Sequence, residues 1–116
     1  MTKEEILAME AGIDLDLLIT KEFFSDVGYH EYSTDISAAW KVVEKLLTVV
    51  NIVDVWGSYI GQEHGGFYCR IRGGITLGLE FTVGPYQGAP EAICKAALLA
   101  KLKGGTDGTE NGPGIS

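Results

Sequence analysis

One segment carries the strongest structural signal in this chain: Tyr32-Ser33-Thr34-Asp35-Ile36-Ser37-Ala38-Ala39-Trp40-Lys41-Val42-Val43-Glu44-Lys45-Leu46. We predict a helix here with Ser33 or Thr34 as its N-cap, because a hydroxyl oxygen can accept a backbone N–H of the first turn. Asp35 then lies near the positive end of the helix dipole. The apolar residues recur at helical spacing and form one stripe: Ile36, Ala39, Trp40, Val43, Leu46 and Leu47. With a tryptophan on the stripe, we expect this face to pack in the core.

A second long helix is predicted near the other end of the chain, over residues 88–103. Pro90 falls in its first turn, where the missing N–H costs nothing, and a glycine pair ends it. Glu91 and Lys95 have the spacing of an i,i+4 ion pair. Because this helix is apolar almost all round, it needs cover on two sides. In so small a chain we expect the second cover to come from another subunit, which would make the protein a dimer.

Two further helices are expected before residue 32. Thr2 and Glu5 have the spacing of a capping box, which indicates a short first helix that Gly12 interrupts. Residues 13–24 follow as a second helix. The first part of that segment also alternates as a strand would, but three consecutive apolar residues, 17–19, break the alternation and favour the helix.

After residue 51 the apolar period changes to two, which is typical of strands. We expect strands at about residues 52–60, 67–72 and 75–83. The second and third strands must turn their apolar faces to the same side. Opposed residues share a face, so the loop between them must have an odd length, most simply Arg72-Gly73-Gly74. The loop between the first two strands is too long to fix which face of the first strand joins which. The predicted class is α+β: an antiparallel sheet of three or more strands with N-terminal helices and a long C-terminal helix.

One side of this hairpin concentrates residues suited to a phosphate-bearing ligand. The chain has nine basic residues but only two arginines, Arg70 and Arg72, and the planar guanidinium group suits bidentate binding of phosphate. Tyr68 shares their face, and Trp56 joins it if its own face lies on that side; both rings could stack on a nucleobase. The alternative is a solvated or partner-covered face, on which an arginine pairs with one of two acidic residues: Glu80 or Asp54.

A second candidate site is the glycine-rich segment from Gly84 to Glu91, which leads into the N-terminus of the last helix. Backbone N–H groups at such a place bind phosphate, and Tyr86 and Gln87 could close over a ligand. The segment lacks the GxGxxG and GxxxxGK[ST] patterns, so a plain strand-to-helix connection is the alternative. Phe81 is expected in the core, where it could also line a pocket below this loop.

Charge and composition exclude several classes of protein. The formal net charge of −7 argues against non-specific binding of DNA or RNA and of anionic membranes, because both need a cationic surface. We see no signal peptide and no apolar run long enough to cross a bilayer. Cys69 and Cys94 are the only cysteines, and we expect two buried free thiols rather than a disulfide.

No metal, cofactor or catalytic site is predicted. His30, His64, Glu63 and Cys69 do not have zinc-ligand spacings. No serine or cysteine has the context of a nucleophile, and no carboxylate pair stands on a catalytic frame. We therefore expect a protein that is not an enzyme.

Three segments of this chain resemble the phage ABA-sandwich domain family: TKEEILAMEAGIDLDLLI at residues 2–19, the YSTDISAAW helix at 32–40 with its VEKL continuation, and APEAICKAALLA at 89–100. The resemblance extends to about Lys103 and ends before the tail. Some members are anti-defence sponges that sequester nucleotide second messengers made by bacterial immune enzymes, notably the cyclic ADP-ribose-type signals of the Thoeris system. Relatives of these sponges also hold cyclic oligonucleotides, as dimers or trimers of dimers.

The resemblance implies a phage protein that acts in the cytoplasm of the infected bacterial host. It implies binding and sequestration, without cleavage, of glycocyclic ADP-ribose isomers or cyclic oligonucleotides by a homodimer or a trimer of dimers. The alternative is a phage structural or protein-interaction module with no nucleotide ligand. We expect one domain over residues 1–103 and a glycine-rich tail over 104–116. The candidate ligand-binding residues are Arg70, Arg72, Trp56, Tyr68, Phe81, Tyr86, Gln87 and Glu91.

Overall fold

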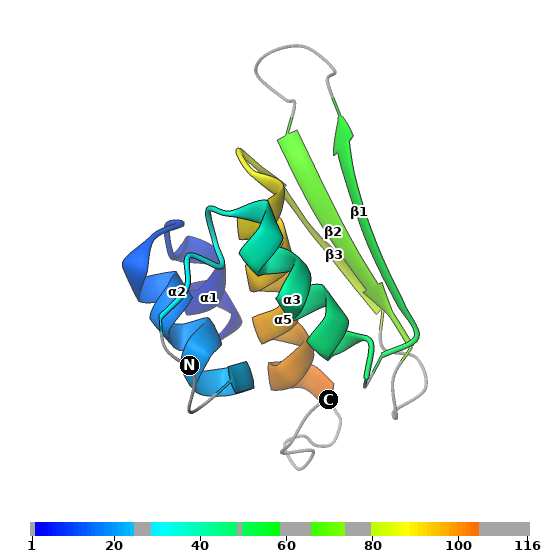
Figure 1. Ribbon diagram of the computed structural model, residues 1–116. Coiled ribbons are helices and arrows are strands. Elements are labelled where there is room, and N and C mark those ends of the chain that lie inside the picture. The colour runs from blue at the N-terminus through cyan, green and yellow to red at the C-terminus, as the bar shows by residue number, and fades with distance from the viewer. Residues whose placement is uncertain (1, 25–28, 49, 59–65, 74–79, 105–116) are drawn as a thin grey trace.

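A computed structural model describes residues 2–24, 29–48, 50–58, 66–73 and 80–104 (Figure 1). The elements follow the chain as α1 (Lys3–Ala8), α2 (Ile13–Ile19), the π-helical segment η1 (Thr20–Phe24), α3 (Ile36–Leu46), β1 (Ile52–Ser58), β2 (Gly66–Arg72), β3 (Glu80–Tyr86) and α5 (Ala89–Gly104). The predicted α+β class is confirmed, since one antiparallel sheet of order β1-β2-β3 packs with helices. No helix within the described ranges is long and apolar enough to cross a membrane. Of the predicted tail, only Gly104, the last residue of α5, is described, so the division at residue 103 stays a prediction.

The N-terminal helices form as their sequence predicts. The Thr2 hydroxyl oxygen accepts the Glu5 backbone N–H at 3.1 Å, and the Thr2 N–H donates to the Glu5 carboxylate at 2.8 Å, which completes the capping box. The predicted helix over 13–24 is confirmed as α2 and η1, the latter with π-helical geometry. Of the alternating apolar residues in its first part, Leu15 and Ile19, four positions apart on one helix face, are buried, whereas Ile13 and Leu17 are exposed.

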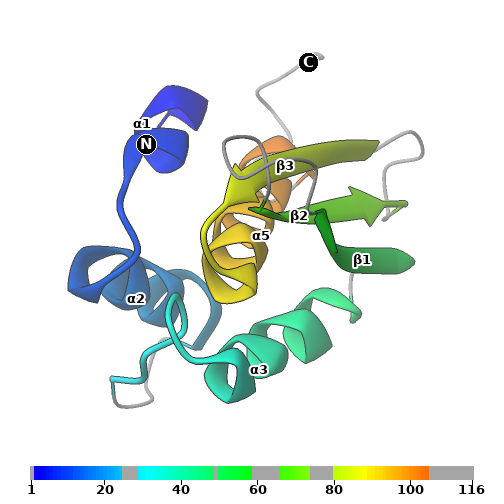
Figure 2. The same ribbon diagram turned by 90° about the horizontal axis from the view of Figure 1, so that it is seen from above.

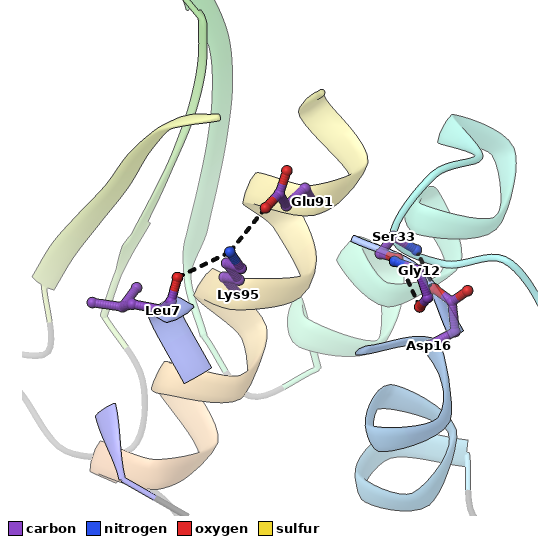
Figure 3. A network of polar contacts seen from close by, with 6 residues as sticks. All are labelled: Leu7, Gly12, Asp16, Ser33, Glu91 and Lys95. Carbon is purple, nitrogen blue, oxygen red and sulfur yellow. Dashed lines mark hydrogen bonds and ion pairs between the residues drawn. The ribbon is translucent and has the colours of Figure 1, made fainter. Parts of the chain in front are cut away.

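The N-cap of α3 differs from the prediction. Asp35 caps the helix, because its carboxylate accepts the Ser37 backbone N–H at 3.0 Å. Ser33 is engaged elsewhere: its hydroxyl donates to the Asp16 carboxylate at 2.6 Å, and its backbone N–H donates to the same oxygen at 2.7 Å (Figure 3). The Ser33 hydroxyl also joins Gly12, so the start of α2 is fastened to the chain that leads into α3.

The packed face of α3 is also rotated from the predicted one. Ala39, Val42, Val43 and Leu46 are buried, whereas Trp40 is 51% exposed and Ile36 50% exposed. The expectation that Trp40 packs in the core is therefore wrong. Helix α3 packs against α5, and its buried residues lie on a face that is centred away from Trp40 and Ile36. The Trp40 side chain is therefore a large apolar group that stays half exposed beside the buried face of α3.

Helix α5 is the centre of the molecule, and its cover comes from the chain itself. Every residue from Ala92 to Ala100 is buried. The sheet lies on one side of α5, and α1, α2 and α3 lie against it elsewhere (Figures 1 and 2). The all-round apolar character of this helix therefore gives no support to a dimer, and the sequence-based argument from it is wrong. Both cysteines are buried and free, as predicted.

The strand pairing confirms the predicted faces but moves the turn. Cys69 lies opposite Val83 and Ile71 opposite Phe81, so their side chains share the inner face. Arg72 pairs with Glu80, which leaves the odd-length connection 73–79 in place of the tight Arg72-Gly73-Gly74 turn. Residues 59–65 and 74–79 lie outside the described part of the chain, and with them most of the first loop, which the sequence predicts at residues 61–66; Gly66 belongs to β2. Strand β3 extends to Tyr86, three residues beyond its predicted end.

Candidate ligand-binding face of the sheet

The outer face of the sheet is the surface turned away from α5. Within the described residues all helices lie on the other side (Figures 1 and 2). The β1–β2 register, which the sequence left open, places Asp54 opposite Arg70 and Trp56 opposite Tyr68. The polar face of β1 and the polar face of β2 therefore form one surface, because opposed residues share a face.

Two aromatic rings and a guanidinium group form a ladder on this face. The Trp56 and Tyr68 rings are stacked, with centroids 5.4 Å apart and an interplanar angle of 10°. The Arg70 guanidinium carbon lies 5.8 Å from the centroid of a Trp56 ring, within the range of a cation–π contact. Trp56 is 40% exposed, so part of its ring surface is open to solvent. Such a ladder offers flat apolar surface and positive charge side by side.

Arg70 already has a carboxylate partner. Its Nε and Nη2 atoms both donate to Asp54 Oδ2, at 3.1 and 2.7 Å. This is the ion pair of the alternative interpretation, and with both side chains more than a third exposed it contributes little to stability. It does hold the guanidinium group in place over the indole. These two bonds use two of the five N–H donors of the guanidinium.

Arg72 extends the cationic side of the ladder toward the end of β2. It pairs in register with Ile52 on one side and Glu80 on the other. The two arginines therefore stand two residues apart on the central strand, each with an acidic residue on a neighbouring strand: Asp54 on β1 and Glu80 on β3. The face is consequently mixed in charge, not uniformly basic.

A glycine in β3 allows Tyr68 to lie as it does. Gly84 has φ +130°, and a Cβ there would lie 2.6 Å from the Phe67 carbonyl oxygen and 2.8 Å from Cδ2 of the Tyr68 ring. Gly84 and Pro85 fall between the pairs Phe67–Tyr86 and Cys69–Val83, where the pairing of β2 with β3 is irregular. Gly84 is the first residue of the glycine-rich segment that is a candidate phosphate site by sequence; in the structure it belongs to β3, where it makes room for an aromatic ring.

The second predicted site is only partly assembled. Gln87 and Gly88 alone connect β3 to α5, so the segment is a plain strand-to-helix connection. Gln87 is exposed, and no interaction places it with the outer face. Phe81 lies on the inner face opposite Ile71 and packs against the core, so the structure separates it from the arginines.

Tyr86 and Glu91 belong to a buried cluster around Lys95 on the inner side of the sheet. The Lys95 ammonium is 2% exposed; it donates to Glu91 Oε2 at 2.8 Å and to the Leu7 carbonyl at 3.0 Å (Figure 3). It also lies 4.2 Å from the centroid of the Tyr86 ring. Burial, and then the charge of Glu91, raise the pKa of Tyr86. Sequence spacing predicted the Glu91–Lys95 pair. Leu7 is 88 residues from Lys95, and no sequence pattern predicted the bond between them.

This cluster has the character of a structural contact. The Lys95 ammonium has three N–H donors, and a carboxylate, a carbonyl oxygen and a ring face already surround it. Of the eight predicted ligand residues, the structure brings four together on the outer face: Trp56, Tyr68, Arg70 and Arg72. Within the described residues no group of three or more His, Cys, Asp or Glu side chains could hold a metal ion.

Comparison with known protein families shows to which family this chain is related. Residues 4–98 match the profile of the phage ABA sandwich domain. The chain belongs to this family. The match spans every described element up to the last turns of α5, so the domain and the described fold coincide. No curated protein and no solved structure matched the chain. The ABA sandwich domain identifies a phage protein.

Proposed function

We propose that this phage ABA sandwich domain protein is an anti-defence sponge that binds a nucleotide immune signal on the outer face of its sheet. The observation that carries the proposal is the Tyr68–Trp56–Arg70 ladder with Arg72 next to it. Stacked aromatic surface suits a nucleobase, and guanidinium groups suit a phosphate or pyrophosphate. The ligand class is a cyclic ADP-ribose isomer or a cyclic oligonucleotide, in the cytoplasm of the infected host. The protein holds this ligand without cleaving it.

Two features support sequestration over turnover. The carboxylate that lies beside the ladder, that of Asp54, is engaged by Arg70 and is therefore not free to act as a general base. The two cysteine thiols are buried beneath the sheet, where burial raises the pKa of Cys69 to about 12 and leaves it protonated at neutral pH. A protein that only binds its ligand needs a site that is complementary to the ligand, whereas an enzyme also needs groups that stabilise a transition state.

The test is depletion and recovery of ligand. Purified protein is incubated with separate cyclic ADP-ribose isomers and cyclic oligonucleotides, filtered, and heat-denatured, and both fractions are analysed by mass spectrometry. The proposal expects one ligand to disappear from the filtrate and to return unchanged after heating. A converted product would indicate an enzyme, and no depletion with protein in tens of micromolar excess would refute ligand binding.

Variants locate the site. Trp56→Ala should weaken binding by about 5- to 150-fold, the equivalent of the ~1–3 kcal/mol that one stacked base contributes. Arg70→Gln should weaken binding and reduce its salt dependence, because a phosphate contact is lost. Lys3→Gln, an exposed cation on α1, is the matched control and should bind as the wild type does. Equal binding by all three variants would place the ligand elsewhere.

One observation favours the alternative of a protein-interaction module. Several large apolar side chains of the helical side are half exposed: Ile13, Leu17, Ile36 and Trp40. Such residues gather where proteins associate. Specific capture of one phage protein by the immobilised domain, with no depletion of any nucleotide, would establish this module and exclude the sponge.

A further inference from the structure

The Asp54 carboxylate bonds to one side of the Arg70 guanidinium and leaves the end of that group to a ligand. Arg70 Nε and Nη2 both donate to Asp54 Oδ2, at 3.1 and 2.7 Å. A guanidinium has five N–H groups in one plane, so both N–H groups of Nη1 and the second of Nη2 point away from this oxygen. These two nitrogens form the end-on fork that binds two oxygens of one phosphate. Asp54 therefore fixes which part of Arg70 meets a ligand.

A phosphate on this fork lies close to the Asp54 carboxylate, because Nη2 donates to both. Two hydrogen bonds of about 2.8 Å from one planar nitrogen place their acceptor oxygens about 5 Å apart. At that distance, each added unit of negative charge on the phosphate weakens binding about 4-fold in bulk water. The Arg70 and Asp54 side chains are 37 and 39% exposed, so water surrounds both groups and this value applies.

The phosphate groups of nucleotides differ in charge by such an increment. A phosphodiester carries one negative charge, and so does a phosphate inside a pyrophosphate bridge. A terminal phosphomonoester carries a charge of about −1.5 to −2 at pH 7, because its second proton dissociates near pH 6. The Asp54 carboxylate therefore opposes a terminal phosphate more strongly than a diester on the same fork.

The other charges described on the outer face leave this discrimination in place. Arg72 pairs in register with Glu80, so the two arginines of the face are matched by two acidic residues: Asp54 and Glu80. Sites for terminal phosphates gather an excess of cations, often together with Mg²⁺. On this face the uncharged Trp56–Tyr68 stack supplies the additional binding surface. A base-bearing ligand of low charge fits the face better than a nucleoside triphosphate does.

We propose that Asp54 is a specificity-determining residue, which positions the Arg70 fork for a phosphodiester or an internal pyrophosphate and rejects nucleotides that end in a phosphomonoester. The ligand class is thereby narrowed to nucleotides without a terminal phosphate. Nucleoside mono-, di- and triphosphates, which compete for any nucleotide site in a cell, fall in the rejected class. This inference rests on the proposed function and adds to it the reason why the site ignores these competitors.

The experiment measures a ratio of affinities by isothermal titration calorimetry at pH 8, where the terminal phosphate carries close to two charges. The probes are cyclic di-AMP and its linear form pApA, which have the same bases and differ by the terminal phosphomonoester. The wild type should prefer cyclic di-AMP. Asp54→Asn keeps the side-chain size and an acceptor oxygen but removes the charge, so the ratio of the two Kd values should fall about 4-fold. Any loss of Arg70 positioning affects both probes and leaves the ratio unchanged.

Glu80→Gln is the matched control. It removes one negative charge from the same face, but Glu80 lies opposite Arg72 and only diagonally from Arg70, so the ratio should change by no more than about 2-fold. Circular dichroism melts of both variants should resemble the wild type, because an exposed ion pair contributes little to stability. Three results overturn the inference: equal wild-type affinity for the two probes, a ratio that Asp54→Asn leaves unchanged, and equal effects of the two variants.

A second measurement separates this inference from the sponge proposal. If neither nucleotide binds the wild type, the sponge proposal fails for this ligand pair, and the Arg70 Nε–Hε resonance is titrated with dimethyl phosphate and with methyl phosphate. The first is a monoanionic diester and the second a monoester. Asp54→Asn should again raise the relative affinity for the monoester about 4-fold. An unchanged ratio in this titration overturns the role of Asp54.

Discussion

Replacing Lys95 by methionine should destabilise the protein substantially while nearly preserving side-chain volume. The substitution removes a 2%-exposed ammonium from Glu91, from the Leu7 carbonyl and from the Tyr86 ring. Breaking a buried ion pair from one side typically costs 3–5 kcal/mol, because the remaining charge is left without a partner. The Glu91 side chain is 15% exposed and can gain some water, so we expect a loss of about 3 kcal/mol, at the low end of that range.

The measurement is the free energy of unfolding in urea, followed by circular dichroism, with thermal melting as a second readout. A loss of about 3 kcal/mol corresponds to a fall in Tm of roughly 12 °C for a domain of this size. Lys101→Met is the matched control on the same helix. Lys101 also bonds a carbonyl and a carboxylate, those of Glu22, but its side chain is 35% exposed, so its loss should cost under about 1 kcal/mol.

A double-mutant cycle identifies the cause. Glu91→Gln alone should cost about 1–2 kcal/mol, and the double variant should be less destabilised than the sum by about 2 kcal/mol, because neither charge is then left alone. Additive effects of the two substitutions would refute the ion pair as the source of the stability. A Lys95→Met variant as stable as Lys101→Met would refute the whole account of this cluster.

Two further predictions concern buried polar groups. Asp16→Ala should lower the free energy of unfolding in urea by about 2–3 kcal/mol, because it leaves the buried Ser33 N–H without its acceptor. Asp14 is exposed on the same helix, so Asp14→Ala should lower it by under about 1 kcal/mol. Equal effects of the two substitutions would contradict this prediction. Burial, followed by the charge of Asp54, raises the pKa of the Cys69 thiol to about 12, and burial likewise raises the pKa of Cys94. Unfolded thiols ionise near pH 8.5, so the free energy of unfolding should be highest below that pH and fall as pH rises toward 12; a flat profile between pH 9 and 11 would contradict it.

The local elements could be predicted because their signals are local. The capping box of α1, the helix over 13–24, the Glu91–Lys95 pair and the alternation of the strands each depend on residues within a few positions of one another. The faces of β2 and β3 followed from the same alternation. The start of α3 was placed within two residues, but its cap was assigned to the wrong side chain, since Ser33 has a partner 17 residues away in Asp16.

The candidate site shows where local reasoning stops. Arg70, Arg72 and Tyr68 share a face by alternation, so the sequence grouped them correctly. Trp56 joins them only through the β1–β2 register, which a long connection leaves undetermined in the sequence. The same alternation places Phe81 on the opposite face of the sheet from these residues. The position of Gly84 beside Tyr68 depends on an irregular pairing of β2 with β3 that no sequence pattern predicted.

By itself, the sequence determined which segments are helix or strand, which strand residues share a face, and that the chain has the segments typical of the phage ABA sandwich domain. Tertiary structure alone decided what covers α5, which side of α3 is buried, and that Lys95 reaches Leu7. The physical reason is that apolar periodicity reports how much surface an element must bury, and not which element buries it. Helix α5 needed cover all round, and only the folded chain shows that its own sheet and helices supply this cover, while Trp40 on α3 stays half exposed.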